Sequence, residues 1–129
     1  EAKMVQFTDG SSNTILMSET LCATKDTDWD GRGDILNDDA AFINHQFMTV
    51  LTPNAGPDLN QCVNLTDPAM PCSNTTANIQ GTARSRHPGG VHVLFGDGAV
   101  RFIANGIDLN SWRALGTMDG GDAIAYGFQ

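Results

Sequence analysis

The stretch VHVLFGDGAVRFI, residues 91–103, decides the fold. Within 91–95, valine, valine and phenylalanine occupy every second position, as expected of a strand that buries one of its two faces. Gly-Asp-Gly at 96–98 supplies residues that tolerate a positive φ, and a second apolar run follows at 100–103. The pattern therefore predicts a β-hairpin closed by a glycine turn.

A short helix is predicted over residues 109–115, directly after the hairpin. Asp108 can cap its N-terminus with a side-chain oxygen, and Gly116 is a typical residue for its C-terminal end. The helix would turn one apolar stripe toward the sheet, because its apolar residues recur at every third position: Leu109, Trp112 and Leu115.

The rest of the chain has weaker patterns. The apolar run at 14–17 fits a strand or a helix, and we favour a strand. Residues 53–83 hold four of the five prolines and few apolar residues, which predicts a long irregular excursion. We therefore expect one α+β domain over residues 1–129, with an antiparallel sheet centred on the hairpin, a short C-terminal helix and long irregular loops.

The charge balance excludes some classes of partner. Seven basic residues stand against fifteen acidic ones, a net charge of −8, so phosphate backbones and anionic membrane surfaces are repelled. We expect no nucleic-acid partner. There is also no run of about eighteen apolar residues, so no transmembrane segment is predicted within the chain.

Three cysteines are present. Cys62 and Cys72 flank a turn-rich stretch that a disulfide can close, although two reduced thiols are the alternative. Cys22 ends an apolar run and is expected to be a buried thiol, because a free cysteine packs like a small apolar residue.

An acidic loop covers residues 25–40. Asp26, Asp28 and Asp30 alternate and are followed by a glycine, as in the first half of a calcium loop, and Asp34 stands where a water-linked ligand falls. The bidentate glutamate that ends an EF-hand loop is missing. Two interpretations stay open, a loose calcium site and a solvated loop whose carboxylates cap its own turns.

Two histidines near the hairpin are candidate metal ligands. Residues five apart on one strand point to opposite faces, so His87 and His92 can share an ion only if the chain bends at 88–90. A firm third ligand is not evident, which makes zinc a weak prediction. Ser85, His87 and Asp97 have the residue types of a catalytic triad, but no nucleophile elbow surrounds the serine, and we expect no enzymatic activity.

The segment SRHPGGVHVLFGDGAVRFIANGIDLNSWRALGTMDGGDAI, residues 85–124, resembles the C-terminal signature of a bacterial pilin-like family labelled domain of unknown function 1559. The hallmark is a histidine, nine residues and Asp-Gly, here His87 and Asp97-Gly98. The opening FTDGSSNTILMSE, residues 7–19, is similar to the same family's D-G-x-S-N-T segment.

Members of that family usually begin with a prepilin-type leader and a hydrophobic helix, and no such helix is expected within residues 1–129. The resemblance implies that residues 1–129 are the C-terminal portion of a pilin-like protein, extracytoplasmic and either secreted or at the cell surface. It implies an assembly role with other pilin-like subunits or surface proteins as partners. His87 would then pin the entry to the hairpin, and Asp97 and Gly98 would shape its turn.

A second function is kept open, because the family is associated by name with extracellular solute binding. In that case the chain would hold a solute or a glycan in a cleft lined by loops. Trp29 would be the exposed aromatic platform.

Overall fold

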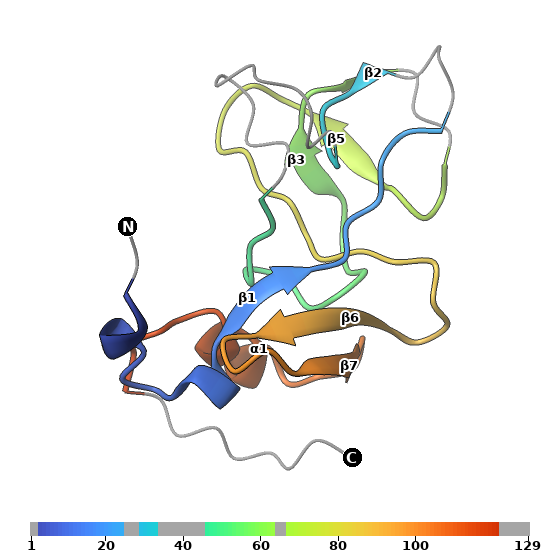
Figure 1. Ribbon diagram of the computed structural model, residues 1–129. Helices are drawn as coiled ribbons and strands as arrows, with labels where there is room; N and C mark the ends of the chain where they lie inside the picture. The colour runs from blue at the N-terminus through green and yellow to red at the C-terminus, as the bar shows by residue number, and fades with distance from the viewer. Residues whose placement is uncertain (1–2, 25–28, 34–45, 64–66, 122–129) are drawn as a thin grey trace.

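The computed structural model describes residues 3–24, 29–33, 46–63 and 67–121 (Figure 1). The elements in chain order are η1 (Met4–Gln6), η2 (Ser11–Asn13), β1 (Ile15–Ser18), β2 (Trp29–Asp30), β3 (Asp58–Asn60), β4 (Cys62–Val63), β5 (Cys72–Asn74), β6 (Gly90–Phe95), β7 (Val100–Ala104) and α1 (Leu109–Leu115). The predicted α+β class is confirmed.

The predicted hairpin is formed by β6 and β7. These strands pair antiparallel from Gly90 opposite Ala104 to Leu94 opposite Val100. At the turn, Gly98 has a φ of 86°, which favours glycine, and the Asp97 carboxylate accepts a hydrogen bond of 2.9 Å from the backbone of Ala99. The turn thus uses Asp97 and Gly98 as expected.

Strand β1 completes the main sheet, in the order β1-β6-β7, and confirms the strand that we favoured at 14–17. It pairs antiparallel with β6, and the register shifts between Ile15 and Met17. The shift makes a bulge, so both Leu16 and Met17 are exposed while Ile15 is buried.

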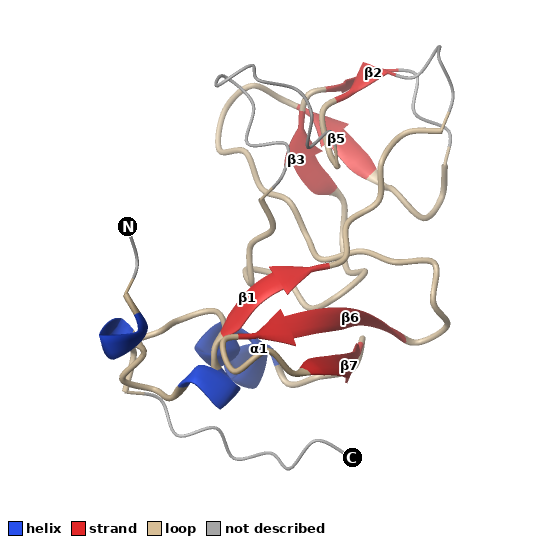
Figure 2. Ribbon diagram, viewed as in Figure 1, coloured by secondary structure: helices blue, strands red, loops and turns tan. Residues whose placement is uncertain are grey.

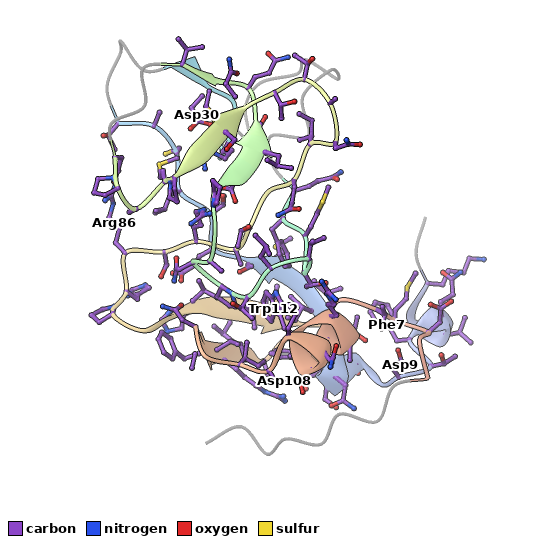
Figure 3. All side chains as sticks on the ribbon, turned by 180° about the vertical axis from the view of Figure 1, so that it is seen from behind. Phe7, Asp9, Asp30, Arg86, Asp108 and Trp112 are labelled. Atoms are coloured by element: carbon purple, nitrogen blue, oxygen red, sulfur yellow. A yellow bond between two sulfur atoms is a disulfide. The ribbon has the colours of Figure 1, made fainter. Side chains whose placement is uncertain are left out.

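Helix α1 has the predicted bounds. The Asp108 side chain caps it by accepting a hydrogen bond of 2.9 Å from the Ser111 backbone, and Gly116 follows its last residue. The helix lies behind the sheet in Figure 1 and in front of it in the reverse view of Figure 3. The Trp112 indole is fully buried and donates a 2.8 Å hydrogen bond to the Leu51 carbonyl.

The apolar core lies between α1 and one face of the three-stranded sheet. Its buried members come from the strands, the helix and the segment before the hairpin: Ile15, Ala83, Val91, Val93, Phe95, Ile103, Trp112 and Leu115. Burial of such side chains stabilises a fold by about 1.5–3 kcal/mol each. This core fixes which face of the sheet is left for function.

Residues 53–83 are more regular than expected. They contain β3, β4 and β5, where β3 pairs parallel with β5, and β2 pairs antiparallel with β4 (Figure 2). The predicted Cys62–Cys72 disulfide is present and joins β4 to β5. A crosslink closing a loop of this size stabilises a fold by about 2–3 kcal/mol in the chain-entropy account, which offsets the shortage of apolar residues here.

A buried ionic network also holds this region together. The Asp58 carboxylate accepts hydrogen bonds from Arg84 Nε at 2.8 Å, from Arg32 Nη1 and from the Thr82 backbone at 3.0 Å. Asp58, Arg32 and Arg84 are each at most 4% exposed. Because one carboxylate joins two arginines from distant segments, it fixes their relative positions more specifically than apolar contacts would.

The prediction that Cys22 is buried is wrong. Cys22 is free and exposed. The pairing of β1 with β6 ends shortly after Ser18, so the apolar pattern no longer directs side chains toward the core by the time the chain reaches Cys22.

Candidate functional site

The face of the main sheet opposite α1 carries a row of apolar side chains that are exposed or, at Leu94, half-buried. Met17, Leu94 and Val100 are neighbours in the cross-strand register, and paired residues point to the same face. Met17 is 64% exposed, Val100 65% and, on the next row, Phe102 44%. We call the surface formed by Met17, Leu94, Val100 and Phe102 the outer face.

Glu19 extends this face by one residue beyond β1. Its backbone N–H donates to the His92 carbonyl at 3.2 Å, and its Oε2 accepts a 2.8 Å hydrogen bond from the His92 N–H. The Glu19 carbonyl in turn accepts a 3.0 Å bond from the Arg84 backbone. Glu19 therefore lies opposite His92, which itself lies opposite Phe102, and backbone bonds hold both sides of the glutamate.

His87 reaches the same place from the loop before the hairpin. A turn at 88–89, in which Gly89 has a φ of 85°, separates it from β6. His87 Nε2 lies 3.0 Å from Glu19 Oε1. The imidazole rings of His87 and His92 stand edge to face with their centroids 4.8 Å apart. The bend that sharing an ion would require is thus present, and His92 also stacks edge to face on Phe102.

Ser85 supports this turn. Its hydroxyl donates a 2.7 Å hydrogen bond to the Gly90 carbonyl and accepts one of 3.1 Å from the His87 N–H. Asp97 lies at the turn between β6 and β7, at the far end of β6 from the turn that follows His87. Ser85 and His87 therefore precede β6 and Asp97 follows it, so the length of this strand separates Asp97 from the other two residues.

The charge state of Glu19 follows from its neighbours. Partial burial alone would raise the pKa of its carboxyl, but the hydrogen bonds from the His92 backbone and the His87 side chain, with the charges of both rings, outweigh it. The pKa of Glu19 is therefore lower than its ordinary value, and the group is an anion at neutral pH.

Glu19, His87 and His92 form a group of metal-ligand types. One ligand atom from each lies within 4.8 Å of the others. The weak zinc prediction had two of these residues and missed the third, because Glu19 is far away along the chain. The signal that could have found it is the family-like segment 7–19, which ends in this glutamate.

The structure describes only part of the acidic loop for which a calcium site is predicted. Asp26, Asp28 and Asp34 lie outside the described residues. Asp30 accepts hydrogen bonds from Arg32 through both carboxylate oxygens, with Nη2 to Oδ2 at 2.6 Å. Calcium binding by this loop stays a prediction, as does the role of Trp29, whose side chain is likewise not described.

Comparison with known proteins gives one match. The family model SBP_bac_10, described as a protein of unknown function (DUF1559), matches residues 1–110. No match was found among curated proteins or among solved structures. No helix within the described part of the chain has the length and apolar character needed to cross a membrane.

Proposed function

The chain belongs to the DUF1559 family, and from that premise we propose that it is a structural component of a pilin-like assembly outside the cytoplasm. Its role is to contact neighbouring subunits, and it carries out no enzymatic step. The Cys62–Cys72 disulfide supports the extracytoplasmic setting, because such bonds persist where the environment is oxidising.

The observation that carries the proposal is the apolar outer face. Methionine, valine and phenylalanine side chains there are 44–65% exposed and adjacent across three strands. Single exposed apolar residues are ordinary on a protein surface, whereas a contiguous set marks an interaction site. A neighbouring subunit of the same family is the occupant we propose, and a second copy of this chain is its simplest representative.

Sedimentation of the chain at rising concentration tests this proposal. The Cys22→Ser background removes the exposed thiol, and a chelator removes metals. We expect association that weakens at least fivefold in Val100→Ser and Met17→Ser, because each substitution removes apolar surface from the contact. Val5→Ser is the matched control, since Val5 is 81% exposed on η1, away from the sheet.

A chain that stays monomeric at millimolar concentration would remove self-contact as the proposed role. Equal effects of Val5→Ser and Val100→Ser would also count against the outer face.

The solute-binding alternative depends on Trp29, and no contact of the described residues favours it.

A further inference from the structure

We propose that Glu19, His87 and His92 bind a divalent first-row transition metal ion, for which zinc is the reference. Two imidazole nitrogens and one carboxylate oxygen form a ligand set that zinc and similar ions accept. Calcium prefers oxygen ligands alone, so this site differs in chemistry from the acidic loop.

The distances fit a tetrahedral ion. Ligands about 2.0–2.1 Å from zinc are separated from one another by about 3.3 Å. Glu19 Oε1 lies 3.0 Å from His87 Nε2, and Glu19 Oε2 lies 3.5 Å from His92 Nδ1. No two of the three ligand atoms are more than 4.8 Å apart, so closure around an ion requires the widest pair to approach by at most about 1.5 Å.

Two of the three ligands are held before any ion binds. His92 belongs to β6, and its N–H orients the Glu19 carboxylate through the 2.8 Å bond to Oε2. Bonds of this kind to a ligating carboxylate raise metal affinity by fixing its direction. His87 lies outside the strands, just before the turn at 88–89, and its side chain is half exposed.

The site is open to solvent. The side chains of His87, His92 and Glu19 are 50%, 43% and 33% exposed, which gives an ion a path of entry. Three protein ligands leave a fourth tetrahedral position for water or for a group from another molecule. The net charge of −8 also raises the local concentration of cations around the chain.

Calorimetric titration of tag-free Cys22→Ser protein with a zinc salt tests the proposal. We expect one ion per chain, and an affinity at least about a hundredfold lower in His87→Gln and in Glu19→Gln, since each removes a direct ligand. Asp119→Asn, which removes an exposed carboxylate elsewhere, and His45→Gln, which removes the third histidine, are the controls and should leave affinity unchanged.

Cobalt substitution gives a readout that does not need variants. Tetrahedral nitrogen and oxygen coordination produces intense visible absorption, and the ring signals of two histidines should shift together in NMR spectra. Circular dichroism in chelator establishes that each variant is folded. The Val100→Ser variant, in which we expect weaker association, should bind zinc as tightly as the parent protein, which separates this site from subunit contact.

Three results would overturn the proposal. One is the lack of saturable binding at millimolar zinc by the folded chain. Another is unchanged affinity in folded His87→Gln. The third is loss of binding in His45→Gln while His87→Gln binds normally.

Discussion

Asp58 connects three segments of the chain around β3. Its buried carboxylate joins Arg32 and Arg84, and the Thr82 backbone donates to it as well. We expect Asp58→Asn to lower the free energy of unfolding by about 3–5 kcal/mol, because the buried Arg84 guanidinium loses its counter-charge and Arg32 keeps only that of Asp30.

Urea denaturation of both proteins measures this loss. Asp97→Asn is the control, since Asp97 is exposed, its partner Arg101 lies 3.5 Å away, and the asparagine oxygen can still accept the Ala99 hydrogen bond, so the change should cost less than about 1 kcal/mol. Equal costs for the two variants would show that the network is not a major source of stability.

The same carboxylate predicts an acid dependence. Burial would raise the pKa of Asp58, but the hydrogen bonds from Arg84 and Arg32 and the charge of Arg84 outweigh it, so its pKa lies below its ordinary value. The folded state therefore binds its proton less readily than the unfolded state. The stability contribution is complete above the unfolded pKa of about 3.9 and is lost as pH falls through the lower folded pKa.

Unfolding free energies measured at several values between about pH 6 and pH 2 check the sign. The wild-type chain should lose more stability across this acid range than Asp58→Asn, which has no proton to bind at this position. A parallel decline in the two proteins would contradict the assignment.

Among the elements, the β6–β7 hairpin needs glycine at two positions, Gly98 and Gly90, for different physical reasons. Gly98 has a φ of 86° with no neighbour within 4 Å of an added Cβ, whereas a Cβ at Gly90 would collide with the Ile103 carbonyl and approach the Phe102 ring at 2.7 Å. We expect Gly98→Ala to cost about 1 kcal/mol through backbone strain, and Gly90→Ala to cost about 3 kcal/mol through overpacking.

Thermal melting of the two variants shows which substitution destabilises the fold more. In addition, Gly98→Asn should be milder than Gly98→Ala, since asparagine tolerates a positive φ better than alanine. A Gly90→Ala variant as stable as the wild type would mean that β6 and β7 are not packed as described.

The elements that could be predicted are those with local signals. Alternation and a glycine turn predicted the hairpin, and a capping aspartate with a terminal glycine predicted α1 within its bounds. The strands within 53–83 were missed because a disulfide and buried charges hold them, and neither leaves a periodic apolar pattern. Patterns in short stretches of sequence therefore do not predict pairing between distant segments of this kind.

The candidate site shows the same limit. His87 and His92 could be found as neighbours in the sequence, and the condition for their meeting, a bend at 88–90, could be stated. Glu19 joins them through strand pairing across more than sixty residues, and pairing partners follow from the fold. The exposure of Cys22 was missed for a related reason. Where β1 stops pairing with β6 depends on the fold, and Cys22 lies beyond that point.

At the scale of the whole molecule, α1 covers one side of the thin main sheet (Figures 1 and 3), and the side chains of the outer face alternate along β6 and β7 with those buried in the core. One side is buried by the chain's own helix, and the other presents apolar side chains beside the candidate metal ligands. A subunit that covers the outer face would give these side chains the burial that the isolated chain lacks.

Chemical crosslinking through a single introduced cysteine tests this claim most directly. In the Cys22→Ser background, Val100→Cys places a thiol on the outer face and Val5→Cys places one on η1, and a short bis-maleimide joins thiols from two chains only when they approach. We predict covalent dimers from Val100→Cys and almost none from Val5→Cys, with the yield reduced by Met17→Ser. Equal yields from the two positions, or none from Val100→Cys at high protein concentration, would contradict the account.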